Sequence, residues 1–229
     1  MKNVYMKRSH LRASQARHLI RCFAIDLTAY QASRISWIHV NTVEKRYNYI
    51  RRSIHRFSQD TDKEVRKWIV EADESYFGPK RIRGKRWRWA GKKIKVLWLR
   101  KRQWKVYVHT VPNCKAKYLL PIIRGKVVRD SIMNTDGWSG YHGLIDLWYK
   151  KHRRVRHSKN EFAIWAKHVN GIESFRSFMK RRIAKFNWIP DDKFILHMKE
   201  SEFRFNCWVD WTDMYKQLLF ILKRFAKVC

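Results

Sequence analysis

Three carboxylates, Asp73, Asp136 and Glu173, are the residues whose type and spacing best suit catalysis. Acids are scarce in this chain, with 19 Asp and Glu against 52 Lys and Arg. Carboxylate oxygens suit Mg²⁺ and Mn²⁺, and two such ions about 3.5–4 Å apart can activate the attacking and leaving oxygens of a phosphodiester. The acids could therefore form a two-metal site. Spacing alone leaves open the alternative that each acid pairs with a neighbouring Lys or Arg.

Strands are predicted to position the first two acids. The residues over 66–78 predict a strand with Asp73 at its end, and those over 95–111 predict two strands around a turn. A further stretch leads to Asp136, which we also expect at a strand end. Strands followed by helices indicate an α+β or α/β domain, which we expect over 65–207.

A helix is predicted to carry the third acid. Ile172, Phe175 and Met179 recur at three- and four-residue spacing, so they form one apolar helix face. Lys180 follows Glu173 by seven residues, or two turns, so these two residues share another face.

The N-terminal segment, residues 1–58, predicts a small all-α helix-turn-helix domain. It carries 12 Lys and Arg against 2 Asp and Glu. Two short helices precede a break at Trp37, and a basic third helix opens with Asn41 and Glu44, which resemble a capping box. The alternative is a plain three-helix bundle with a solvated basic face. Residues 208–229 are expected to form a C-terminal helix or tail. The residues expected to face DNA are Asn41, Thr42, Lys45 and Arg46.

The net charge of +33 predicts a polyanionic partner. Double-stranded DNA is the first expectation and an anionic membrane the second, while a basic structural protein without chemistry is the alternative. Residues 80–105 hold 13 Lys and Arg and no acid, so they are expected to follow the phosphates, unless they form a solvated edge hairpin. The further residues expected to contact DNA are Arg86, Arg88, Lys92, Lys93, Arg181 and Arg182.

Other features narrow the class of protein. No apolar signal sequence is expected in the first residues, and the longest apolar runs, such as LLFIL at 218–222, are too short to span a bilayer. The four Cys show no C-x-x-C spacing, which argues against a zinc ribbon or a disulfide framework. We therefore expect a reducing, cytoplasmic location and no membrane.

Five ordered motifs over 66–207 carry a family resemblance. They are DESYFG, DGWSGYHGL, HSKNEF, HVNGIESF and LHMKESEFRFN. Together they resemble the DDE transposases of bacterial insertion sequences, specifically the ISXO-type transposase domain. The resemblance implies an RNase H-like catalytic fold behind a helix-turn-helix. It also implies that Asp73, Asp136 and Glu173 ligate metal, that Lys180 contacts DNA, and that His168 and Asn170 line the site.

The resemblance implies a reaction as well. Two Mg²⁺ or Mn²⁺ ions would assist water in cutting the element ends, and the freed 3′-OH would attack target DNA. The implied partners are the element's terminal repeats and target DNA, bound by a homo-oligomer near the bacterial nucleoid. Asn170 competes with Glu173 as third ligand, and Arg176 stands where the family carries Trp. An inactive remnant that only binds DNA is the alternative. A metal nuclease built on His157, Asn160, His168 and Asn170 is weak, because the spacing fits no metal motif.

Tryptophan usage departs from the family pattern. The chain has 12 Trp and 8 Gly, and relatives tend to carry Gly at nine of the Trp positions. A genetic code that reads TGA as glycine would explain the set, and the rival explanation is that these side chains stack on bases. Under the first hypothesis we expect positive φ at such residues and greater stability with Gly. The nine are Trp37, Trp68, Trp87, Trp89, Trp98, Trp104, Trp148, Trp165 and Trp188.

Overall fold

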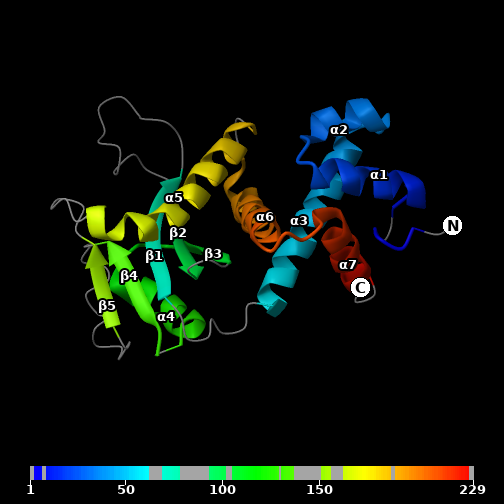
Figure 1. The fold of residues 1–229 in the computed structure, drawn as a ribbon. Coiled ribbons are helices and arrows are strands. Elements are labelled where there is room, and N and C mark those ends of the chain that lie inside the picture. Colours follow the sequence, from blue (N-terminus) through cyan, green and yellow to red (C-terminus); the bar gives the residue numbers. More distant parts are fainter. Residues whose placement is uncertain are drawn as a thin grey trace, which may run out of the picture. The chain divides into compact units, whose positions relative to one another are not determined.

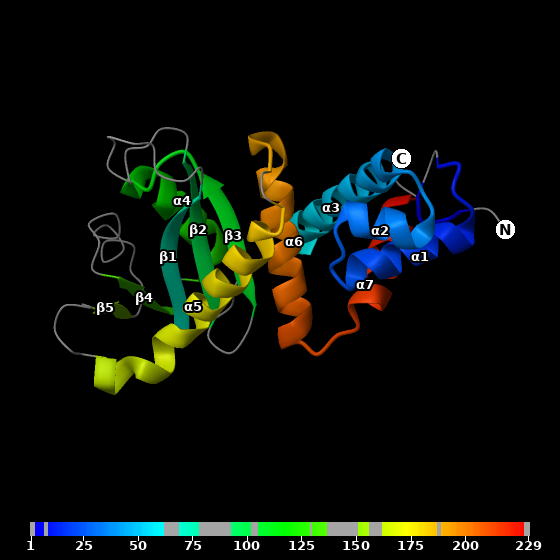
Figure 2. The ribbon, with the colours of Figure 1, turned by 90° about the horizontal axis from the view of Figure 1, so that it is seen from above.

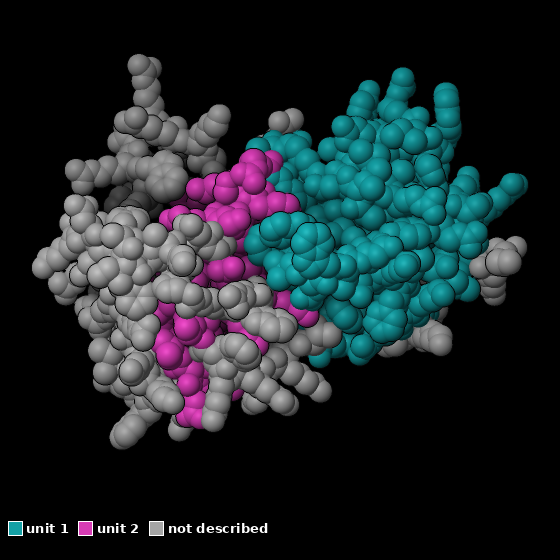
Figure 3. Space-filling model, in the orientation of Figure 1, with its two compact units in different colours: residues 1–61, 182–229 teal, residues 62–181 magenta. Residues whose placement is uncertain are grey.

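The computed structural model describes residues 3–6, 9–61, 69–77, 93–101, 105–128, 130–136, 151–155, 162–186 and 189–226. It describes only the backbone at 61, 136, 151–155 and 162–171. The chain forms two compact units, one of residues 1–61 with 182–229 and one of residues 62–181 (Figure 3). The predicted boundaries at 58, 65 and 207 differ from this division, because residues 182–207 pack with the N-terminal segment. We call the two the helical unit and the sheet unit.

The helical unit is built around the predicted N-terminal helices (Figure 1). Leu19, Ile20 and Phe23 of the first helix are buried against Tyr47 of the third, and the C-terminal helix adds Leu222 to the same core. The C-terminal residues are thus a core element of this unit. The helices are α1 (Ala13–Ala24), α2 (Ala29–Ser36), α3 (Val40–Thr61), α6 (Asp191–Val209) and α7 (Met214–Ala226).

Local hydrogen bonds explain where α2 and α3 begin. Thr28 caps α2, since its Oγ1 accepts from the Gln31 amide at 3.2 Å and Gln31 bonds back to the Thr28 amide. Asn41 was predicted to cap the third helix, and this is wrong. His39 precedes α3 and its Nδ1 accepts from the Asn41 amide at 3.3 Å, so Asn41 lies inside the first turn. Its side chain is exposed, as is that of Lys45.

Trp37 ends α2 in a conformation that favours glycine. Its φ is 56° and its ψ 28°, and its side chain is 93 % exposed. A left-handed C-cap is commonly Gly, because a Cβ is strained there. Trp211, which follows α6, has the same features, with φ 52° and 89 % exposure. The tight turn between α2 and α3 is therefore built for glycine but occupied by tryptophan.

Trp37→Gly is expected to raise the free energy of unfolding by about 1 kcal/mol, because Gly relieves the left-handed strain. Thermal melting followed by circular dichroism measures this, with a rise of about 3 °C expected. Trp37→Ala is the matched control, since Ala also removes the exposed ring but keeps the Cβ. An equal gain from Ala would show that φ is not the cause.

The sheet unit holds a mixed five-stranded sheet, which confirms the predicted mixture of strands and helices. Its strand order is β3-β2-β1-β4-β5, with β1 antiparallel to β2, β2 antiparallel to β3, and β4 parallel to both β1 and β5 (Figures 1 and 2). The elements are β1 (Ile69–Phe77), β2 (Ile94–Lys101), β3 (Val106–Val111), α4 (Ala116–Lys126), β4 (Ile132–Asp136), β5 (Lys151–Val155) and α5 (Phe162–Ala184).

The two helices of this unit cover opposite faces of the sheet (Figure 2). Leu119 of α4 belongs to the cluster that includes Leu97 and Leu99 of β2. Trp98 lies between these two residues and points the other way, where its ring meets Phe175 of α5 at 5.0 Å. Trp98 is fully buried in extended backbone. It therefore does not occupy a glycine conformation, unlike Trp37.

A buried charge cluster joins α3 and α6 to the α1–α2 turn. Glu200, 1 % exposed, forms ion pairs with Arg51 at 2.8 Å, Arg204 at 2.8 Å and Arg182 at 2.5 Å. Burial raises the pKa of Glu200, but the three guanidinium groups outweigh it and hold this pKa well below its usual range. Arg204 also donates to the carbonyls of Phe23 and Ala24 at the end of α1. These bonds fix the turn that leads into α2.

This cluster corrects one expected DNA contact. Arg182 was predicted to bind phosphate, yet it is 4 % exposed and its guanidinium contacts Asp26 at 3.1 Å and Glu200 at 2.5 Å. A buried guanidinium that pairs with two carboxylates is not available to DNA.

Two other expectations concern cysteines and membranes. Among the described residues, Cys22, Cys114 and Cys207 are buried and form no disulfide, while Cys229 lies outside those residues. Among the helices that the structure describes, none combines the length and apolarity needed to cross a bilayer.

Candidate active site

The sheet brings the first two predicted acids to neighbouring positions. β1 and β4 run parallel, with Val70 opposite Met133 and Ala72 opposite Thr135. Asp73 and Asp136 each come one residue later, so they stand at the same level on strands about 4.8 Å apart. Asp136 ends β4 as predicted. Asp73 does not end its strand, because β1 continues to Phe77 along its antiparallel partner β2.

The Asp73 carboxylate is held by two described donors. Its Oδ1 accepts from the amide of Glu74 at 2.8 Å, and its Oδ2 meets Nη1 of Arg176 at 2.5 Å. The carboxylate is 19 % exposed and the guanidinium 32 %. Arg176 belongs to α5, so this ion pair ties the centre of the sheet to the helix above it.

One face of α5 anchors it to the sheet, and another carries the predicted third acid. Ile172, Phe175 and Met179 are buried, as their spacing predicted. Glu173 and Lys180 are exposed. Arg176 lies three residues after Glu173 and four before Lys180, so the three residues follow one side of the helix. That side flanks Asp73, because Arg176 reaches it.

The remaining predicted site residues are described less fully. His168 and Asn170 lie in α5, but only their backbone is described, as for Asp136. His157 and Asn160 fall outside the described residues. Among the described side chains, which do not include the Asp136 carboxylate, no three His, Cys, Asp or Glu gather closely enough to bind a metal ion.

Some of the residues predicted to contact DNA are exposed, and others are partly buried. Thr42 and Arg46 are half-buried beside the exposed Asn41 and Lys45 in the first turns of α3. Lys93 is half-buried before β2, and Arg181 is exposed with its Nη1 on Ser177 Oγ at 2.5 Å. The contacts that lie outside the described residues are Arg86, Arg88 and Lys92.

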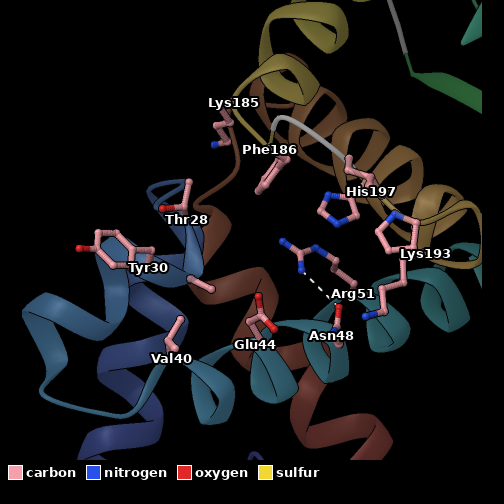
Figure 4. A pocket seen from close by; sticks show the side chains of 13 residues that line it. Thr28, Tyr30, Val40, Glu44, Asn48, Arg51, Lys185, Phe186, Lys193 and His197 are labelled. Atoms are coloured by element: carbon pink, nitrogen blue, oxygen red, sulfur yellow. Dashed lines mark hydrogen bonds between the residues drawn. The ribbon is translucent and has the colours of Figure 1, made fainter. Parts of the chain in front are cut away.

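The helical unit contains a cavity that the sequence did not suggest. Its volume is about 490 Å³, and Tyr30, Arg51, Lys193 and His197 are among the residues that line it (Figure 4). His197 is 6 % exposed, and its ring packs edge-on against Phe186 at 4.7 Å. Burial, and then the charge of Arg51, lowers the pKa of His197 to about 3. The imidazole is therefore neutral in the folded protein at neutral pH.

This buried imidazole predicts a loss of stability in mild acid. The pKa of His197 is about 3 when folded and 6.5 in its ordinary state, so the unfolded chain binds more protons between these values and stability falls as the pH falls. From pH 7 to 5.5 we expect a loss of about 1 kcal/mol from this residue. Urea unfolding at both pH values measures it.

The matched control for that measurement is His197→Gln, which cannot titrate. It should show a shallower pH dependence than the wild type. His55, whose pKa burial also lowers, titrates in both proteins and cancels in the comparison. Equal slopes in the two proteins would contradict the assignment to His197.

A known family matches the sheet unit and the residues that follow it. The ISXO2-like transposase domain matches residues 67–206. The chain belongs to the ISXO2-like transposase family. The match contains the Asp73 and Asp136 positions, all five strands and α5, so the candidate site lies within the transposase domain.

One curated relative agrees with this membership. An uncharacterized transposase-like protein of Haemophilus influenzae is 42 % identical over 123 residues, which cover 54 % of this chain and 94 % of the relative. Among solved structures, the Mos1 strand transfer complex covers 97 % of this chain and 78 % of its own, with 12 % identity and a TM-score of 0.35. A pre-cleavage Mos1 transpososome covers 98 % of this chain and 80 % of its own, with 12 % identity and a TM-score of 0.37.

Proposed function

We propose that this transposase-family chain cleaves DNA at the ends of an insertion sequence and joins those ends to target DNA. The observation that carries the proposal is the parallel register of β1 and β4, which sets Asp73 and Asp136 side by side. Separated acids in a chain of net charge +33 would each be offset by a single Lys or Arg, as Arg176 offsets Asp73, and could not share a metal ion. Two acids at one level of a sheet form a site that attracts a divalent cation.

The donor set fits the metal ions that the family implies. Asp73 and Asp136 offer hard carboxylate oxygens, and Glu173 lies on the side of α5 that flanks Asp73, with Asn170 one turn before it. We propose Asp73, Asp136 and Glu173 as the ligands, with Asn170 as the alternative to Glu173. Two bound Mg²⁺ or Mn²⁺ ions would supply Lewis acidity and lower the pKa of the attacking water.

The protein's own part in the reaction is to hold and orient the DNA. In hydrolysis, the water oxygen bonds to phosphorus, the bond from phosphorus to the 3′ oxygen breaks, and that oxygen leaves as a hydroxyl. In strand transfer, the freed 3′-OH attacks a target phosphate in the same way. Lys180, two turns from Glu173, is proposed to hold a phosphate beside the acids, and the residues of 80–105 to follow the backbone.

The helical unit is proposed to bind the terminal repeats as a helix-turn-helix. The short α2, the tight turn at Trp37 and the longer α3 support this reading. Exposed Asn41 and Lys45 lie at the start of α3, the end of a recognition helix that reads base edges. We further propose an RNase H-like fold for the catalytic domain, supported by the mixed sheet with α4 and α5 on opposite faces. Assembly as a homo-oligomer on paired ends stays a prediction.

Cleavage of the element's own ends tests the proposal. Purified protein is incubated with labelled duplexes that carry those ends, with Mg²⁺ or Mn²⁺, and products are separated on denaturing gels. We expect hydrolysis that leaves a 3′-OH and, with target DNA present, a joined product. Binding of the duplex without cleavage in either metal would instead support an inactive remnant that acts only as a DNA-binding protein.

A further inference from the structure

Arg176 contacts a carboxylate oxygen of Asp73, the acid that the proposed function makes a metal ligand. Its Nη1 lies 2.5 Å from Oδ2 of Asp73, while the other oxygen accepts from a backbone amide. A guanidinium on this oxygen takes one of its lone pairs and offsets the negative charge that would attract a metal ion. Metal and guanidinium therefore compete for the same atom.

This competition depends on the positive charge of Arg176. An uncharged side chain at this position could not neutralise Asp73. The backbone around Arg176 is held in place, so only its side chain is free to leave the contact. Phe175 beside it is packed on Trp98, and Met179 one turn later is fully buried, so α5 is held in place above β1.

We propose that Arg176 is a positioning residue that holds the Asp73 carboxylate in the metal-free protein and is displaced when a divalent ion binds. The inference rests on the proposed function, which makes Asp73 a metal ligand. The side chain is one-third exposed, so it can swing away without carrying a charge through the core. Its new position beside the acids would then face the DNA phosphates, next to Lys180 on the same side of α5.

The consequence is a weaker metal site, which binds a divalent ion at a higher ion concentration than the same site would need without Arg176. Breaking a partly exposed ion pair reduces metal affinity modestly, because solvent screens both charges. We expect Arg176→Gln to bind Mn²⁺ about 5- to 10-fold more tightly than the wild type, which corresponds to about 1 kcal/mol. Isothermal titration of the DNA-free protein with MnCl₂ measures this affinity without any reliance on activity.

Arg181→Gln is the matched control. It removes the same charge from the same helix, but Arg181 is exposed and its Nη1 contacts Ser177 rather than an acid. We expect its Mn²⁺ affinity to stay within about twofold of the wild type. Asp73→Asn should remove the tight Mn²⁺ binding from both the wild type and Arg176→Gln. Circular dichroism melts of all variants verify that each is folded.

The outcomes separate the inference from the function on which it rests. If Arg176→Gln binds Mn²⁺ no more tightly than the wild type, or if Arg181→Gln gains as much, the proposed role of Arg176 is wrong. The metal site itself still stands in that case, provided that Asp73→Asn removes binding. If neither wild type nor Arg176→Gln binds Mn²⁺ at Asp73, both the inference and the two-metal proposal are overturned.

Discussion

Asp73→Asn is expected to reduce cleavage of the element ends by about 10²-fold or more while duplex binding stays within about twofold. The amide keeps the size of the side chain but loses the negative charge that a divalent ion needs. Asp136→Asn should have the same effect, because the two residues stand at one level of adjacent strands. Gel assays of cleavage and of binding, run on the same protein preparations, separate the two quantities.

Glu74→Gln is the control for these variants. Glu74 follows Asp73 along β1, so its side chain projects from the other face of the sheet, and cleavage should be unchanged. If Asp73→Asn and Asp136→Asn both keep wild-type activity, the proposed set of acids is wrong. If both variants instead lose cleavage, Glu173→Gln and Asn170→Ala, tested side by side, decide the third ligand, since only the true ligand should match the loss seen for Asp73.

Glu200→Gln is expected to destabilise the helical unit by about 3–5 kcal/mol. The substitution leaves Arg51, Arg182 and Arg204 gathered in the interior without the carboxylate that compensates them. Such a loss is a large part of a typical margin of about 5–15 kcal/mol. Thermal melting and urea unfolding by circular dichroism should therefore show a midpoint lower by roughly 10 °C.

An exposed ion pair provides the comparison for this prediction. Arg224 meets Asp60 at 3.3 Å, and both side chains are about half exposed, at 47 % and 48 %. Asp60→Asn should cost less than about 1 kcal/mol, because water screens the pair and solvates the remaining charge. A Glu200→Gln protein that melts within about 1 °C of the wild type would show that the three guanidinium groups find other partners.

Local periodicity was sufficient to predict most elements. The spacing of Ile172, Phe175 and Met179 predicted the buried face of α5, and the alternation over 95–111 predicted the hairpin of β2 and β3. These patterns succeed because each element must bury one face, and the chain repeats apolar residues at the period of that element. The residue that caps α3 was harder to predict, because the side chains of both His39 and Asn41 can accept from a free amide. Only the path of the backbone places His39 at the cap.

Non-local contacts explain the remaining errors. Arg182 reads as one more basic residue in KRR, but it is buried because Asp26, 156 residues away, and Glu200 meet it in the folded unit. Trp37 and Trp98 looked alike as departures from family glycines. The structure separates them, since one lies exposed with positive φ and the other is packed between sheet and helix.

By itself, the sequence determined the basic character of the chain, its helices and strands, and the family motifs that single out Asp73, Asp136 and Glu173, because composition, periodicity and motif order are local properties. Only the tertiary structure decided that β1 and β4 pair in the register that makes Asp73 and Asp136 neighbours, and that Arg176 closes on Asp73. Strand pairing and ion pairs between residues 103 positions apart depend on how separate elements pack, and a one-residue slip in register would undo them.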